Sequence, residues 1–221
     1  MKRFLEGRLN IAKALSSDVP GASYADVVLI ITAILSACAS LRWPGRGIDK
    51  KRFIELLVKQ SKNGFHTSWV SIPALINQRF ISEKEAPYRR GNSTRIFRGE
   101  EIDLPLDKAR EQYPNLPLKK LKENCYASLI YERLRCGYAH EYCSHEDITH
   151  VPASRHKARV SYIGRTFPGG DLKRMASFHL DYLMDIAKYH VSNIPSKKSS
   201  PPKTWWILDE GEQSGGGDKT A

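Results

Sequence analysis

Hydrophobic positions recur at helical spacing over most of the chain, so the pattern predicts a mostly α-helical fold. We expect a short helix within residues 1–20 and a long apolar helix from Ser23 to about Leu41. Ser23 and Asp26 have the spacing of a capping box at the start of that second helix, which is apolar nearly all round and therefore belongs in the core. Further helices are predicted from Asp49 to Gly64, Ser68 to Phe80, Lys119 to about Ala139, and Asp171 to about Ile194.

Three segments lack the helical pattern. Residues 82–115 are rich in charge, proline and glycine, which indicates an irregular insertion with a short strand at Thr94–Phe97. Apolar and polar residues alternate at 147–151 and 158–163, which predicts a β-hairpin over 147–163. Residues 195–221 are rich in Ser, Pro, Lys and Gly, so we expect a flexible tail. Within it, Trp205-Trp206 either docks on a surface or lies exposed.

The pattern as a whole predicts one domain over residues 1–194, a bundle of four to five helices with a small inserted β-hairpin.

The net charge of the chain indicates which classes of binding partner it favours. The chain has 221 residues, a formal net charge of +11 and a pI of about 9.5. Such an excess attracts polyanions, nucleic acid first, although an ordinary basic soluble protein has the same property.

The cysteines, the N-terminal residues and the longest apolar run indicate where in the cell the protein is expected. The four cysteines form no CxxC pair, which is typical of reduced thiols rather than a disulfide framework. The first residues lack the apolar core of a signal peptide. The longest apolar run, Val27 to Leu41, is shorter than the roughly 20 residues of a membrane span. We therefore expect a cytoplasmic protein without a membrane partner.

The candidate chemistry lies at the end of the predicted 119–139 helix, in Arg135, His140 and Tyr142. Arginine is a permanent cation whose planar fork suits a phosphate, and histidine exchanges protons near neutral pH. Residues five apart on an α-helix differ by ~140° around the axis and ~7.5 Å along it, so Arg135 and His140 do not share a face. Gly137 between them favours a loosened or ended helix. A two-fold dimer of this segment would bring together two copies of each side chain.

Such a cleft would have a simple mechanism for RNA. A neutral His140 would remove the proton of a ribose 2′-OH, which attacks the adjacent phosphorus. Arg135 would hold the phosphate oxygens, and the second, protonated His140 would give a proton to the leaving 5′-oxygen. The products would be a 2′,3′-cyclic phosphate and a 5′-hydroxyl, with no metal or cofactor required.

The segment from Arg135 to His140 resembles the R-x4-6-H signature of the HEPN superfamily, helical domains found in many prokaryotic toxins and antiviral RNases. Glu141-Tyr142 extends it to R-x4-H-x-Y, which resembles the HEPN toxins that are paired with nucleotidyltransferase antitoxins. The resemblance implies a helical bundle, a homodimer with the motif at its interface, and metal-independent RNA cleavage. It marks Arg135 and His140 as catalytic, and Tyr142 as a supporting residue or a target of modification by an antitoxin.

Other basic residues are candidates for binding the RNA backbone. Arg133 also satisfies R-x6-H and competes with Arg135 for the phosphate role. The remaining candidates are Arg89, Arg90, Arg95, Arg98, Lys119 and Lys120. A run of charge is as often simply a solvated face.

Two alternatives stand beside the enzyme. One is a non-catalytic HEPN module that binds RNA or a partner protein. The other is a zinc-supported binding domain, since Cys136, His140, Cys143, His145 and His150 lie close in sequence. Structural zinc sites usually show paired ligands at C-x2-4-C or H-x3-5-H spacing. His140 and His145 fit the histidine spacing, as do His145 and His150, but no cysteine pair accompanies them, which favours surface and loop histidines.

Overall fold

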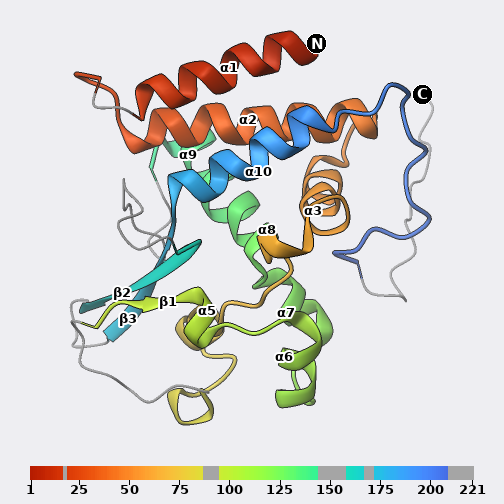
Figure 1. Cartoon of the computed structure of the whole chain (residues 1–221). Coiled ribbons are helices and arrows are strands. Elements are labelled where there is room, and N and C mark those ends of the chain that lie inside the picture. Colours follow the sequence, from red (N-terminus) through yellow and green to blue (C-terminus); the bar gives the residue numbers. More distant parts are fainter. Residues whose placement is uncertain (17–18, 87–94, 144–157, 167–171, 209–221) are drawn as a thin grey trace.

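The computed structural model describes residues 1–16, 19–86, 95–143, 158–166 and 172–208 (Figure 1). The α-helices are α1 (Lys2–Leu15), α2 (Tyr24–Arg42), α3 (Asp49–Lys59), α4 (Ile72–Asn77), α5 (Gly99–Ile102), α6 (Leu106–Gln112), α7 (Leu118–Glu123), α8 (Tyr126–Leu129), α9 (Cys136–Glu141) and α10 (Leu180–Ser192). Two 3₁₀ turns, η1 (Asn63–Phe65) and η2 (Glu83–Glu85), and a π-helical segment, η3 (Ile130–Arg135), complete the helical part. The strands are β1 (Phe97–Arg98), β2 (Val160–Thr166) and β3 (Leu172–Phe178). The expectation of a mostly α-helical fold is confirmed for the described residues.

Helices α1, α2 and α10 pack against one another along one side of the molecule (Figure 1). The capping box that the sequence predicts for α2 is present, since the Ser23 N–H donates to the Asp26 carboxylate at 2.7 Å. Buried residues from Ala25 to Ala39 lie along one side of α2, while Ala33 on the opposite side is exposed. The helix therefore packs in the core against α1, α3 and α10 on one side and is not fully buried all round.

Helix α2 is also the one helix among the described residues whose length and composition would let it cross a membrane. Of its 18-residue apolar window, 56% is buried inside the fold. Burial of this kind is what a core helix of a folded domain shows.

The sheet corrects two expectations. Residues 172–178 form strand β3 rather than the start of the last helix, which begins at Leu180. Strand β3 pairs antiparallel with β2 from Val160↔Phe178 to Thr166↔Leu172, so the hairpin spans 160–178 rather than 147–163. The apolar residues of 172–178 fit helical spacing, but pairing with β2 satisfies their backbone groups in a buried position. The expected first arm, 147–151, lies outside the described residues.

Residues 82–115 are more regular than their composition predicts. Strand β1 at Phe97–Arg98 pairs with β2, close to the strand expected at 94–97. Helices α5 and α6 follow, so the expectation of an irregular insertion is wrong for residues 97–112. Ala109 and Tyr113 of this region join a second, smaller apolar cluster with Leu75 and Leu121. Burial in that cluster supplies the order that the local sequence lacks.

The predicted 119–139 helix is broken after α7, at Asn124 and Cys125. Cys125 has extended backbone angles and forms an antiparallel bridge with Val70. Val70 bridges Leu104 as well, and for this reason the helix expected over 68–80 shortens to α4. These backbone pairs between distant segments override the local helical pattern.

The chain after α10 packs on the domain. Trp205 is 5% exposed and meets the Trp43 ring edge-on at 5.8 Å. The Trp206 N–H donates to the buried Glu55 carboxylate at 2.7 Å, and Lys122 Nζ donates to the Leu208 carbonyl at 2.9 Å. The expectation of a flexible tail is therefore corrected for residues 195–208, and its remainder lies outside the described residues.

A buried polar network joins the smaller cluster to the rest. The Asp103 carboxylate accepts hydrogen bonds from the Tyr126 hydroxyl, from the Tyr162 hydroxyl at 2.7 Å and from the Ile72 N–H at 3.0 Å. The Tyr162 hydroxyl also lies 2.7 Å from that of Ser71. Asp103, directly after α5, is thus linked to β2 and to the starts of α4 and α8.

The first prediction concerns pH. Burial raises the pKa of Asp103 to about 7, against the hydrogen bonds from Tyr126, Tyr162 and Ile72, which lower it. The folded state then binds the proton more tightly than the unfolded chain does. The contribution of this group to the free energy of unfolding is therefore greatest below about pH 4 and declines until about pH 7. Asp103→Asn, which cannot ionise, should remove a decline of about 4 kcal/mol, measured by urea unfolding between pH 4 and 8.

Asp107→Asn is the matched control, because Asp107 is exposed in the first turn of α6. It should leave the pH dependence of unfolding as in the wild type. An Asp103→Asn variant with the wild-type pH dependence would contradict the raised pKa.

The second prediction concerns Gly99. A Cβ added there would lie 2.2 Å from the Tyr126 hydroxyl oxygen and 3.1 Å from the Asp103 carboxylate. Tyr126 is fully buried and hydrogen-bonded, so it has no room to move, and Gly99→Ala should destabilise the fold by about 1–3 kcal/mol. Gly7→Ala in α1, where nothing lies within 4 Å, should instead stabilise it by about 1 kcal/mol. Thermal unfolding followed by circular dichroism compares the two, and equal effects would contradict the close approach at Gly99.

Candidate functional site

The segment that carries the R-x4-H motif begins at Tyr126, where the chain leaves its pairing with residues 67–71. The Tyr126 N–H donates to the Trp69 carbonyl at 3.0 Å, and the Ala127 N–H donates to the Thr67 carbonyl at 2.8 Å. These are N–H groups that a helix start leaves without an intrahelical partner. The contacts fix where α8 begins and therefore where the motif lies three turns later.

The helix is widened just before the motif. Residues Ile130–Arg135 form the π-helical segment η3. Such widened turns are rare in proteins overall, and many of those that do occur lie at functional sites. Ile130, Leu134 and Tyr138 point into the core at intervals of four, while Arg133 and Arg135 are both half-exposed. Both arginines thus reach the surface.

Arg135 rests on its own segment. Its guanidinium lies over the Tyr131 ring at 5.3 Å from the centroid, and Nη1 is 3.7 Å from the Cys136 sulfur. Tyr131 in turn meets Phe53 of α3 at 5.2 Å. A cation over an aromatic face is held in place while its outer N–H groups stay available to an anion.

His140 and Tyr142 lie at the exposed end of α9. Tyr142 caps the helix with left-handed backbone, φ +54°, and its hydroxyl donates to the Asp26 carboxylate at the start of α2. That hydrogen bond, with those from Ser23, holds the pKa of Asp26 below its usual range. The end of the motif is thereby attached to the start of the core helix.

Tyr138, between Arg135 and His140, is the anchor of the motif. It is 2% exposed, and its ring lies 6.2 Å from that of Tyr24 in α2. The Tyr24 hydroxyl donates to the Phe178 carbonyl at 2.6 Å, at the end of β3. Tyr24 therefore ties the motif helix to the junction of β3 and α10.

Within one chain, Arg135 and His140 are not brought together. In the part of the chain that the structure describes, no hydrogen bond joins the two side chains, and the α-helical path from Cys136 to Glu141 keeps them on different faces. A single copy therefore does not present the two side chains on one face of α9.

Apart from Arg133 in η3, the predicted RNA-binding residues that the structure describes lie away from the motif, in two groups. The Arg95 guanidinium lies 4.5 Å from the centroid of the Phe97 ring. Arg98, the residue after Phe97 in β1, is exposed. Lys119 and Lys120 lie on α7, where Lys120 pairs with Glu123 at 2.8 Å. Figure 1 shows β1 and α7 in the lower half of the molecule, apart from α9. Arg89 and Arg90 lie outside the described residues.

The described residues offer no group of three or more His, Cys, Asp and Glu side chains placed to hold a metal ion. His145 and His150, two members of the zinc alternative, lie outside these residues.

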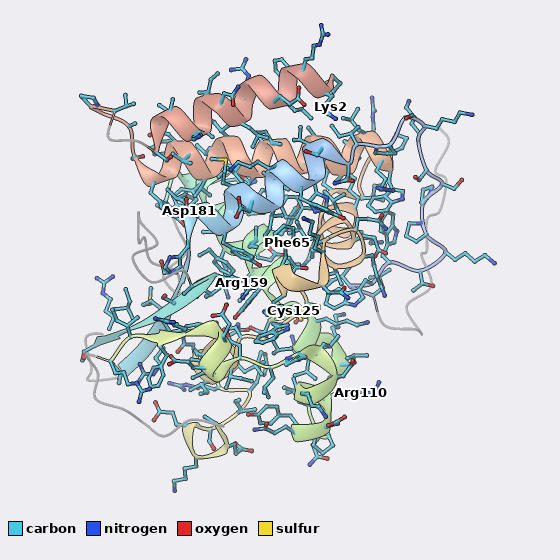
Figure 2. All side chains as sticks on the ribbon, viewed as in Figure 1. Lys2, Phe65, Arg110, Cys125, Arg159 and Asp181 are labelled. Carbon is cyan, nitrogen blue, oxygen red and sulfur yellow. The ribbon has the colours of Figure 1, made fainter. Side chains whose placement is uncertain are left out.

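The sequence did not reveal a groove of about 470 Å³ between η1, the start of β2 and α10. Its lining includes Lys62, Phe65, Arg159 and Asp181, and Figure 2 labels the last three near the middle of the view. These residues come from three distant segments, so no local pattern joins them. The nearest sequence signal is Asp181 and Asp185, one helical turn apart.

A scan against protein-family models finds no match to this chain, and searches of curated proteins and of solved structures find none either.

The third prediction concerns the end of the motif. Tyr142→Phe removes the hydroxyl that donates to Asp26, so the pKa of Asp26 should rise, while the Ser23 hydrogen bonds still hold it below its usual value. NMR titration of the Asp26 carboxyl measures the change. Tyr189→Phe, near the C-terminal end of α10, is the matched control and should leave the pKa of Asp26 unchanged. An unchanged pKa of Asp26 in the Tyr142→Phe variant would show that the hydrogen bond from Tyr142 to Asp26 does not form in solution.

Proposed function

We propose that this chain is a metal-independent endoribonuclease of the HEPN type that acts as a homodimer. The observation that carries the proposal is that Arg135 and His140 reach the surface on either side of the buried Tyr138. A structural arginine–histidine pair would bond a neighbouring helix. The contacts described for Arg135 are with Tyr131 and Cys136 of its own segment.

The proposed reaction needs only groups that the motif supplies. A neutral His140 takes the proton of a ribose 2′-OH as its oxygen forms a bond to phosphorus. The bond from phosphorus to the 5′-oxygen breaks, and the protonated His140 of the second copy gives that oxygen a proton. Arg135 donates hydrogen bonds to the phosphate oxygens, whose charge grows in the transition state. The products are a 2′,3′-cyclic phosphate and a 5′-hydroxyl.

Charge and surface support the choice of substrate and dimer. A net charge of +11 favours a polyanion, and the 2′-OH that the mechanism needs is present in RNA and absent from DNA. Tyr142, within the motif, is 56% exposed. An exposed aromatic side chain at the site suits a face that a second copy covers.

The same proposal covers the cellular role. A HEPN-type RNase with an exposed R-x4-H-x-Y segment is suited to work in the cytoplasm as a toxin or antiviral effector restrained by an antitoxin or regulatory protein. Tyr142, at the open end of α9, offers the site for such control.

A second candidate function is a non-catalytic module that binds RNA or a partner protein. The separation of Arg135 from His140 within one chain favours it, because an arginine alone can bind a phosphate without cutting the chain.

The fourth prediction tests the reaction. Wild type should cleave a mixed RNA in excess EDTA and leave 2′,3′-cyclic phosphate ends, and Arg135→Ala and His140→Ala should each lower the rate by at least about 100-fold. Arg110→Ala, an exposed arginine on α6, is the matched control and should cleave as wild type does. Arg133→Ala separates the two arginines, since loss of cleavage in Arg133→Ala but not in Arg135→Ala would move the phosphate role to Arg133.

Absence of cleavage by the wild type would favour the binding module. Equal cleavage by all variants would place the activity outside this motif. A rate per chain that falls on dilution below the dimer dissociation constant would support the two-copy cleft, and a rate per chain that does not change on dilution would contradict it.

A further inference from the structure

The groove of about 470 Å³ lies apart from the motif residues and has a mixed lining. Lys62, Gly64 and Phe65 come from the region of η1, Arg159 from the start of β2, and Asp181 and Asp185 from the first turns of α10. A cavity of this size is in the range that small ligands occupy, roughly 300–1,000 Å³.

Aromatic rings form a rigid part of the lining. The Phe65 ring meets Tyr189 of α10 edge-on at 5.6 Å. The Tyr182 hydroxyl donates to the Phe65 carbonyl at 2.7 Å, which holds the η1 region against α10. A ring fixed by such contacts presents an apolar surface on which a base can lie at low entropic cost.

Two cations lie on the rim. Lys62 Nζ is 5.2 Å from the centre of the Tyr189 ring and remains exposed. Arg159 pairs through Nη1 with Glu100, which leaves its other N–H groups to donate elsewhere. Lysine and arginine N–H groups are the usual protein partners of a phosphate.

The two carboxylates of the lining differ in their partners. The Asp185 carboxylate forms an ion pair with Lys188 Nζ at 3.5 Å. Asp181 is exposed and forms no hydrogen bond or ion pair within the described part of the chain. A carboxylate is acceptor-only, so Asp181 suits a ligand that carries N–H or O–H donors as well as a phosphate.

We propose that this groove binds one nucleotide unit of RNA, an inference that rests on the proposed function and adds a substrate-recognition site to it. Lys62 and Arg159 hold the phosphate, Phe65 carries the base, and Asp181 accepts hydrogen bonds from the base or the ribose. A fatty ligand would offer no partner to the charges of Lys62 and Asp181, and a purely anionic ligand would be repelled by the Asp181 carboxylate. The combination of ring, phosphate and donors is that of a nucleotide.

The fold connects the groove to the motif. Asp181 lies in the first turn of α10, directly after Phe178, His179 and Leu180. Phe178 accepts the hydrogen bond from Tyr24, whose ring packs against Tyr138 within the motif. An RNA strand held in the groove is thus bound to the same framework that fixes α9.

The fifth prediction uses calorimetric titration of the full chain with an unlabelled RNA tetranucleotide, in a His140→Ala background that leaves the RNA uncut. Lys62→Ala and Asp181→Asn should each weaken binding about tenfold, the loss typical of one charge-assisted hydrogen bond. The matched controls on α6, Lys108→Ala and Asp107→Asn, are exposed and should bind as the parent does. A single mononucleotide should compete for the site, with the same ranking of variants.

Binding that is equal in Lys62→Ala, Asp181→Asn and the controls would overturn the groove proposal, and so would absence of binding in the parent. Either of these two results would overturn the groove proposal whether or not the wild type cleaves RNA. Weakened binding confined to the two groove variants supports the groove, even where the cleavage test at Arg135 and His140 fails. All variants change exposed side chains, and circular dichroism checks that each one folds.

Discussion

The carboxylate of Asp103 is the constraint on which the lower half of the molecule depends. It is 4% exposed and accepts hydrogen bonds from Tyr126, Tyr162 and Ile72, which lie on three different segments. Burying a carboxylate costs free energy unless hydrogen-bond donors surround it. The hydrogen bonds to Asp103 therefore hold these segments together. Because Tyr126 is the first residue of α8, the same contact fixes the start of the helical path that ends in the motif.

The upper half fixes the other end of that path. Tyr24 of α2 contacts Tyr138 and donates to Phe178, and Tyr142 donates to Asp26. The motif helix is therefore attached to α2 at Tyr138 and at Tyr142, with His140 exposed between these two points and Arg135 half-exposed before the first. Rigid support of the motif, with its reactive side chains facing outward, is what the proposed two-copy site requires. The proposed groove shares this framework through the junction of β3 and α10.

Much of the helical framework follows from local sequence. The capping residues Ser23 and Asp26 and the apolar positions from Val27 to Ala39 are sufficient to predict α2 and its packing in the core, but not that only one side of it is fully buried. The location of the candidate chemistry is predictable for the same reason. Arg135, His140 and Tyr142 are adjacent in sequence, and the helix before them is amphipathic.

The sequence by itself determined the mostly helical class, the first helices and the motif, since each depends on residues within a few turns of one another. Only the tertiary structure decided the break at Cys125, the strand at 172–178, the docking of Trp205 and the groove. Each of these joins segments far apart in the chain. At such places, backbone pairing and burial against a distant partner outweigh local helix propensity, which is worth less than about 1 kcal/mol per residue for residues other than proline.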